Sequence, residues 1–203
     1  MSMENDTYTT IASPSQETLF KEKGSKFYGY AYPVSSEDEI REHLDQLKKV
    51  HHSARHWCYA WVLGQGYERY RANDDGEPSN SAGAPIHGQI QSFNLTNVLV
   101  VVVRYSGGTK LGVGGLIQAY RSSAKLALEA SQLETRTINE VFTIRFPYSE
   151  MNTVMRIVKS EGITIEYQNM ELDCEFRISI RRSEADKVKN LFEQQPKIDI
   201  KIE

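Results

Sequence analysis

The sequence predicts an α+β protein with two domains. The apolar run at residues 98–103 is followed by a glycine-rich turn and a helical pattern, which is typical of a buried strand that leads into a helix. From residue 141 onward, short alternating segments and two amphipathic patterns follow one another in a different style. The length of 203 residues accommodates one large domain or two small ones.

The first part of the chain predicts three strands and a helix. Residues 8–11, 17–23 and 25–32 have strand-like composition, and the last of these segments is rich in aromatic residues. Ser36 opens a capping box because Glu39 stands three residues later. A helix is therefore predicted there, with an apolar stripe made of Ile40, Leu44, Leu47 and Val50.

The middle of the chain predicts a hairpin and two helices around the buried strand. Residues 56–63 are predicted as a strand that a short turn joins to a second run at 67–72. A polar loop follows at 73–80, and a helix opens at 81–85. The helix after the glycine-rich turn is predicted to extend to about Leu133.

The last third predicts the order strand, helix, strand, strand, helix, strand. In sequence these segments are 141–146, 147–158, 163–167, 172–180, 183–192 and 198–202. This order is typical of a ferredoxin-like sandwich, in which two helices back one antiparallel sheet. We place the domain boundary near residues 133–137, which gives an N-terminal domain of residues 1–134 and a C-terminal domain of residues 135–203.

The composition is that of an ordinary globular protein, with 39% hydrophobic and 25% charged residues. No apolar run reaches the length of a membrane span, and the N-terminus lacks the features of a signal peptide, so we expect a cytoplasmic protein. The net charge of −3 argues against coating nucleic acid by bulk attraction, so any such contact needs a local patch. Cys58 and Cys174 are expected to be buried free thiols.

The glycine-rich turn is the first candidate site. It holds five glycines in nine positions, namely Gly107, Gly108, Gly112, Gly114 and Gly115. A turn of this kind directs several backbone N–H groups at one spot, and the dipole of the following helix adds positive potential. Arg104, Lys110 and Arg121 bracket the turn, so the pattern predicts an anion site, with phosphate as the best match.

A second interpretation of the same turn stays open. Glycines between a strand and a helix also serve only to let the helix pack closely on its sheet. The spacing matches neither a P-loop, because Lys110 precedes Gly112, nor a dinucleotide-binding fingerprint. Nucleotide hydrolysis and hydride transfer therefore receive little support.

The acidic segment at residues 74–79 is the second candidate site. Asp74, Asp75 and Glu77 offer oxygen ligands for Mg²⁺ or Ca²⁺, although their spacing is not that of an EF-hand. Clusters of this composition are also ordinary turn chemistry. In a third interpretation, one of these carboxylates pairs with Arg104 or Lys110 and organises the glycine-rich loop. We predict no cofactor and no resident metal.

The remaining reactive residue types favour structural roles. His52 and His56 have zinc-ligand spacing only on a helix, and the chain from residue 57 onward is strand-like. His56 and Cys58 share a strand face but lie apart, which disfavours a thiol nucleophile. Two predicted strands carry aromatic residues, namely Phe27, Tyr28, Tyr30, Tyr59 and Trp61. Such side chains can stack on nucleic-acid bases, but aromatic residues in strands more often belong to the hydrophobic core.

Three linked motifs follow one another in the chain. They lie at residues 52–60, at residues 74–85, and at residues 101–120, which include the glycine-rich turn. In this order they resemble the YigZ/IMPACT family over about residues 20 to 130, and the C-terminal part resembles the small domain of the bacterial YigZ type. The chain departs from the family pattern at residues 79–82, at Ser106 in place of an aromatic residue, and at Arg121 in place of a small one.

The resemblance implies a particular fold and role. Its N-terminal domain would be an α/β sandwich of the type shared by a ribosomal small-subunit protein and domain IV of elongation factor G. Its C-terminal domain would be ferredoxin-like, similar to domain V of that factor. Eukaryotic IMPACT members regulate translation by competing for an activator of a kinase of initiation factor 2α, so a ribosome- or RNA-linked role is implied. Fold analogy alone does not define function.

The sequence thus predicts a regulator without catalytic residues that binds RNA or the ribosome. The candidate phosphate-binding residues are Lys26, Arg55, Arg104, Gly107, Gly108, Lys110, Gly112, Gly114, Gly115 and Arg121. One alternative is an enzyme acting on a phosphorylated small molecule or nucleotide, with Asp74, Asp75 or Glu77 as metal ligand or base. The other alternative is a protein-docking module.

Overall fold

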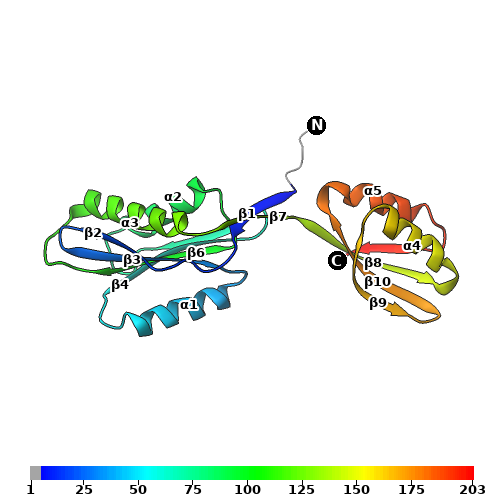
Figure 1. Cartoon of the computed structure of the whole chain (residues 1–203), viewed down its shortest axis with the longest axis horizontal. Helices are drawn as coiled ribbons and strands as arrows, with labels where there is room; N and C mark the ends of the chain where they lie inside the picture. Colours follow the sequence, from blue (N-terminus) through cyan, green and yellow to red (C-terminus); the bar gives the residue numbers. More distant parts are fainter. Residues whose placement is uncertain (1–5) are drawn as a thin grey trace. The chain divides into compact units, whose positions relative to one another are not determined.

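The computed structural model describes residues 6–203, and these residues form two compact units. One unit is Tyr8–Arg136. The other is Thr137–Glu203 together with residues 6 and 7 (Figure 1). The prediction of a mixed architecture of helices and strands is confirmed, with several sheets and five α-helices among the described residues. No helix in this part of the chain is long and apolar enough to cross a membrane.

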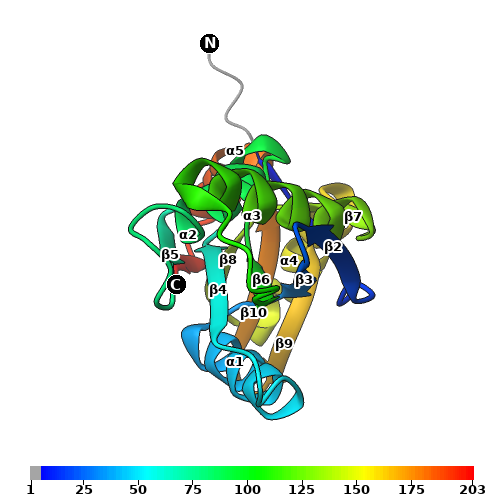
Figure 2. The ribbon, with the colours of Figure 1, turned by 90° about the vertical axis from the view of Figure 1, so that its left-hand side faces the viewer.

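The unit Tyr8–Arg136 is built on an antiparallel five-stranded sheet of order β2-β3-β6-β4-β5. Its strands are β2 Thr18–Glu22, β3 Ser25–Pro33, β4 His56–Leu63, β5 Arg69–Asn73 and β6 Val98–Tyr105. Helix α1, Glu37–Val50, covers one face of the sheet. Helices α2, Gly83–Ser92, and α3, Gly112–Glu129, cover the other face (Figure 2).

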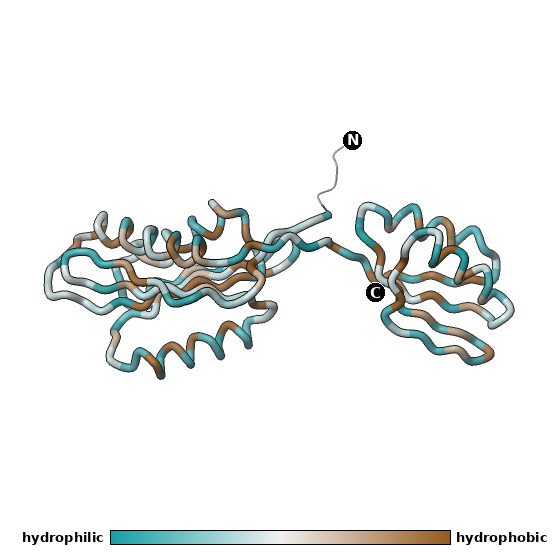
Figure 3. The backbone as a smooth tube through the Cα atoms, viewed as in Figure 1, coloured by the Kyte–Doolittle hydropathy of each residue, from teal (hydrophilic) through white to brown (hydrophobic). Residues whose placement is uncertain are grey.

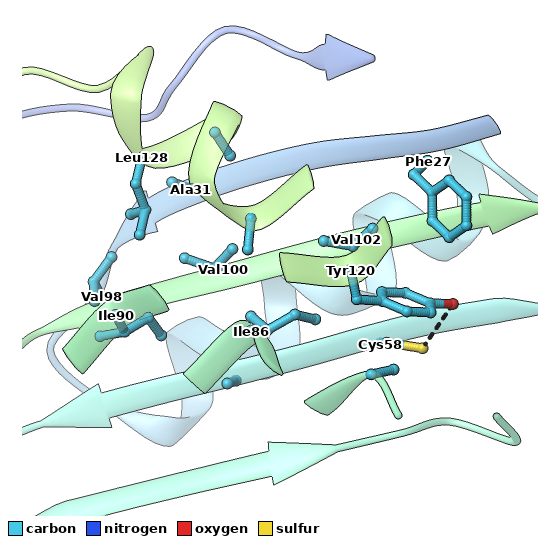
Figure 4. Close-up of a cluster of buried hydrophobic side chains, with 14 of the residues drawn as sticks. Phe27, Ala31, Cys58, Ile86, Ile90, Val98, Val100, Val102, Tyr120 and Leu128 are labelled. Atoms are coloured by element: carbon cyan, nitrogen blue, oxygen red, sulfur yellow. Dashed lines mark hydrogen bonds between the residues drawn. The ribbon is translucent and has the colours of Figure 1, made fainter. Parts of the chain in front are cut away.

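Strand β6 lies at the centre of this unit, and its residues 98–103 are all 0% exposed. Side chains alternate along a strand, so Val98, Val100 and Val102 enter the core under α2 and α3 (Figure 4). The residues between them enter the core under α1. The predicted strand buried on both faces is therefore confirmed, and the sheet is covered by helices on both sides because β6 is apolar on both sides.

Two details of this unit differ from the prediction. Val50 is 70% exposed, so the buried part of the apolar stripe of α1 ends at Leu47. Helix α3 ends at Glu129 and does not reach Leu133, which instead begins strand β7, Leu133–Thr137. Strand β7 pairs with β1, Thr7–Ile11. Because β1 is so distant in sequence, the residues around Leu133 do not indicate that they form a strand.

The second unit contains an antiparallel sheet of order β11-β8-β10-β9. Its strands are β8 Asn139–Pro147, β9 Thr164–Met170, β10 Asp173–Arg181 and β11 Asp199–Ile202. The short turn η1, Tyr148–Glu150, leads into α4, Met151–Ser160, and α5, Arg182–Glu193, follows β10. Hydropathy alternates along the strands (Figure 3). The apolar side chains form one core with both helices.

The two units have separate hydrophobic cores, so a cavity in one core should leave the other intact. Phe176 is fully buried in the second unit. We expect Phe176→Ala to lower the free energy of unfolding of that unit by about 3–5 kcal/mol. Amide hydrogen exchange, resolved by residue, measures the effect in each unit.

The matched control is Leu99→Ala, which opens a cavity in the other core and is expected to act only within Tyr8–Arg136. Equal loss of protection in both units for either variant would contradict separate cores.

Candidate anion-binding site

The glycine-rich segment connects the end of β6 to the start of α3. Strand β6 ends at Tyr105 and α3 begins at Gly112, so the turn itself is residues 106–111. Gly114 and Gly115 lie in the first turn of the helix, whereas the sequence placed them in the loop. Residues 106–110 are exposed, and the side chain of Leu111 is buried beneath them. We call residues 106–115 the glycine-rich loop.

Geometry favours glycine at three positions of this loop, one of which is Gly108, with a φ of +82°. A Cβ at Gly107 would lie 2.1 Å from the carbonyl carbon of Gly24, so only glycine lets the β2–β3 turn pack against the loop. Gly112, the first residue of α3, has a φ of +74°. Residues with a side chain rarely adopt this backbone conformation, so a substitution there would be strained. The close-packing interpretation therefore holds at Gly107, while Gly108, Gly112 and Gly114 face open space.

The backbone N–H groups of residues 109–114 have no hydrogen-bond partner among the described residues. Gly107 N–H donates to Ser25 Oγ at 3.1 Å and Gly108 N–H donates weakly to Ser106 Oγ at 3.5 Å. The N-cap residue, Leu111, offers no capping side chain, and the first turn of α3 carries no acidic residue. The N-terminus of this 18-residue helix therefore keeps its free donors and its positive potential.

Arg104 is buried in an ion pair and is not exposed beside the glycine-rich loop. Its guanidinium Nη1 lies 2.7 Å from Glu77 Oε1, and the two side chains are 9% and 4% exposed. Tyr120 Oη donates to the same Glu77 oxygen at 2.6 Å, and Arg104 Nη2 donates to Ser25 Oγ at 3.4 Å. The guanidinium also lies over the ring of Phe27, 5.6 Å from its centroid.

The contacts of Ser25 connect the two loops. Glu77 belongs to the acidic loop, Arg104 lies on β6, and Ser25 Oγ accepts hydrogen bonds both from Arg104 and from Gly107. The sequence suggested that a carboxylate of the acidic segment pairs with Arg104 or Lys110 and organises the glycine-rich loop. The observed contacts are of this kind, with Glu77 as the carboxylate and Arg104 as the cation. Ser25 and Tyr120 were missed by sequence reasoning because neither is charged, and Tyr120 lies 43 residues from Glu77.

The other two carboxylates accept hydrogen bonds from backbone N–H groups. Asp74 Oδ1 accepts from Gly83 N at 2.8 Å and from Ala82 N at 3.1 Å, at the start of α2. Asp75 Oδ2 accepts from Trp57 N at 2.8 Å. Among residues 6–203, no group of three or more acidic, histidine or cysteine side chains is placed to hold a metal ion. The contacts that Asp74 and Asp75 make are those of helix and loop capping.

The structure gathers some of the predicted cations near the glycine-rich loop and separates others. Lys110 is exposed within the loop, and Lys26 is exposed opposite Tyr105, the last residue of β6. Arg55 is exposed just before β4, whose first residue pairs with Arg104, so it lies at the same end of the sheet. Arg121 lies roughly 13 Å along α3 from Gly112, given the rise of a helix, and beside α2.

Cys58 is a structural thiol. It is 0% exposed, and Sγ–H lies 3.0 Å from the carbonyl oxygen of Asp74 and 3.4 Å from Tyr120 Oη. Burial raises the pKa of this thiol well above its ordinary range, since an apolar site disfavours the thiolate. The ring of His56 is held by the carbonyl oxygen of Asp75 at 2.8 Å. Neither residue is positioned as a nucleophile or its base.

Taken together, the helix-covered sheet and the exposed glycine-rich loop define a class of α/β module with an open strand-to-helix turn. The family model for the Impact N-terminal domain matches residues 23–128, more than half of the chain. The protein belongs to the IMPACT family, and the resemblance found in the sequence is confirmed.

Two relatives named as IMPACT family members agree with this assignment, and a solved structure shares the fold. The chain is 30% identical to IMPACT family member YvyE of Bacillus subtilis over 178 residues. This alignment covers 88% of this chain and 82% of the relative. It is 30% identical over 134 residues to IMPACT family member YigZ of Escherichia coli, covering 65% of this chain and 66% of the relative. A crystal structure of a hypothetical protein has the same fold over 96% of each chain, with a TM-score of 0.71 and 22% identity.

The buried pair of Arg104 and Glu77 should be sensitive to the loss of one partner. We expect Glu77→Gln to lower the free energy of unfolding by about 3–5 kcal/mol, because it leaves a buried guanidinium without its counter-ion. Urea unfolding of the full chain measures this change. The control is Glu37→Gln, whose exposed partner is Arg69, with an expected change below about 1 kcal/mol. Equal effects of the two variants would contradict the buried pair.

The buried thiol gives a prediction for pH dependence. In a Cys174→Ser background, alkylation of Cys58 in the folded protein should stay slow from about pH 7 to about pH 9, because its raised pKa keeps the thiol protonated. In denaturant the same thiol has its ordinary pKa, and its alkylation should accelerate over this range. Rates are followed by mass spectrometry, and a parallel acceleration in the folded protein would contradict the assignment.

Proposed function

We propose that this IMPACT family member is a translation-associated regulator that binds structured RNA or the ribosome through backbone phosphates at the glycine-rich loop. One observation carries the proposal: the N–H groups of residues 109–114 are unpaired at the N-terminus of α3. Unpaired amides and a helix dipole form an anion-binding arrangement that suits phosphate oxygens. The role in translation rests on the family, whose eukaryotic members regulate that process.

The charges around the loop support contact with a polyanion despite the net charge of −3. Lys26, Arg55 and Lys110 are exposed, and they lie on three different elements at one end of the sheet. Phosphate contacts position a protein on RNA without reading its sequence. A local patch of this size therefore serves positioning, and it gives binding that weakens with salt.

The arrangement of the second unit is compatible with the same proposal. Its strand order corresponds to fourth, first, third and second in chain order, with two helices on the sheet, and this supports a ferredoxin-like sandwich. We extend the proposal to the fold types of elongation factor G, with domain IV as the counterpart of the unit Tyr8–Arg136 and domain V as that of the second. The second unit would then widen the RNA-binding surface.

The two alternatives are weaker on the contacts observed. An enzyme using the acidic loop needs a free carboxylate, but Asp74, Asp75 and Glu77 each accept hydrogen bonds from protein donors. A protein-docking module remains an alternative that copurification distinguishes, since a partner retained after RNase treatment would favour it.

Lys110 supplies a sharp test of the phosphate site. We expect Lys110→Glu to weaken RNA binding roughly tenfold and to lower the slope of log affinity against log salt by about one. Fluorescence anisotropy with a structured RNA over a salt series measures both quantities. The matched control is Lys125→Glu, a change of equal charge at an exposed position further along α3, with a smaller expected effect and an unchanged slope.

A second variant separates binding from folding. Gly114 lies in the first helical turn with open space around it, so Gly114→Asp should add a favourable helix-dipole contact while it repels phosphate. Weaker RNA binding with undiminished stability supports the proposal. RNA binding that neither Lys110→Glu nor Gly114→Asp changes would overturn it.

A further inference from the structure

A cavity of about 500 Å³ opens beside the glycine-rich loop, on the α1 side of the sheet. Its lining residues come from the strand ends, the β2–β3 turn, the end of α1 and the loop: Glu17, Gly24, Lys26, Tyr28, His51, Tyr105 and Ser106. Gly24 packs directly against Gly107, so the cavity and the loop share a wall. The volume is in the range of pockets that hold small organic ligands.

The walls of this cavity are aromatic and fixed in orientation. The rings of Tyr28 and Tyr105 meet edge to face with centroids 5.7 Å apart, and the His51 ring lies 5.2 Å from Tyr28. His51 is buried, and its Nδ1 lies 2.9 Å from Tyr105 Oη while its Nε2 lies 2.5 Å from Tyr30 Oη. Hydrogen bonds at both ring nitrogens hold His51 and Tyr105 in place, so a planar ligand meets a preformed surface.

The polar groups of the cavity favour a ligand edge that donates hydrogen bonds. The Glu17 carboxylate is half exposed, and its Oε2 accepts the hydroxyl of Tyr30. Its other oxygen has no partner among the described residues, and Oε2 keeps a second lone pair, so both carboxylate oxygens can accept hydrogen bonds from a ligand. Lys26, an exposed residue, also lines the cavity. Of the four RNA bases, guanine alone presents two adjacent N–H donors, N1–H and the N2 amino group, on one edge.

We propose that this cavity binds one unstacked nucleobase, with guanine preferred, from the RNA whose phosphates the glycine-rich loop holds. The proposal rests on the proposed function and adds a base-reading element to it. Single bases splayed from loops and bulges are the usual targets of sequence-dependent RNA recognition, and tyrosine rings are common stacking partners. The shared wall at Gly24 and Gly107 would let one nucleotide place its base in the cavity and its phosphate at the loop.

The test compares ring removal with ring retention at Tyr28. The hydroxyl of Tyr28 makes no hydrogen bond among the described residues, so Tyr28→Phe keeps the stacking face without disturbing the fold. Binding is measured by anisotropy with a short uridine RNA that carries one guanosine, and by calorimetry with GMP. We expect Tyr28→Leu to weaken both by roughly 5- to 100-fold and Tyr28→Phe to change them less than about twofold. Tyr70→Leu, an exposed tyrosine of β5 outside this cavity, is the matched control.

Glu17→Gln tests the base preference. It should reduce the preference for the guanosine RNA over an all-uridine RNA of equal length, because the amide is a poorer acceptor than the carboxylate. A preference for guanosine that Glu17→Gln leaves unchanged would overturn the assignment of Glu17.

The outcomes separate this proposal from the proposed function. RNA binding that depends on Lys110 but not on Tyr28 would overturn the base pocket and leave the phosphate site in place. GMP binding that depends on Tyr28, without any RNA binding, would support the pocket with a free nucleotide as ligand and overturn the proposed function. Binding of neither RNA nor GMP would overturn both.

Discussion

The buried ion pair of Arg104 and Glu77 is the contact on which the geometry around the glycine-rich loop depends. Removing a guanidinium and a carboxylate from water is costly, and their attraction offsets this only when the remaining donors find acceptors. Here Tyr120 and Ser25 supply additional hydrogen bonds, although Arg104 Nε stays without a partner. A pair of this kind contributes little net stability, but it fixes which segments lie together.

The segments that it joins are far apart in the sequence. Glu77 lies in the acidic loop, Arg104 near the end of the central strand, and Ser25 at the start of β3, where it also receives the N–H of Gly107. The β2–β3 turn, the acidic loop and the glycine-rich loop are thereby held at one end of the sheet. The buried guanidinium of Arg104 is used for structure, and the donors left exposed at this end of the sheet are backbone amides and the side chains of Lys26, Arg55 and Lys110.

Sequence patterns predicted the elements of this protein well because most of them depend on local chemistry. Burial or a helix start can be read from adjacent residues in three cases. These are the capping residue Ser36, the six apolar residues of β6, and the alternating apolar and polar residues of β10. The predictions failed where the partner was remote. Leu133 was assigned to a helix because nothing nearby shows that strand β7, which it begins, pairs with β1. For Arg104 the sequence left several partners open, because Glu77 lies 27 residues away.

The sequence alone determined the mixed architecture, the doubly buried central strand, the exposed glycine-rich turn and membership of the IMPACT family. Only the tertiary structure decided which cations remain free, which carboxylates are engaged by backbone amides, and that Tyr28 lines a cavity while Phe27 next to it is buried. The reason is physical: periodicity and turn chemistry act between near neighbours, whereas a charge or a ring takes its role from groups that only the folded sheet brings within contact.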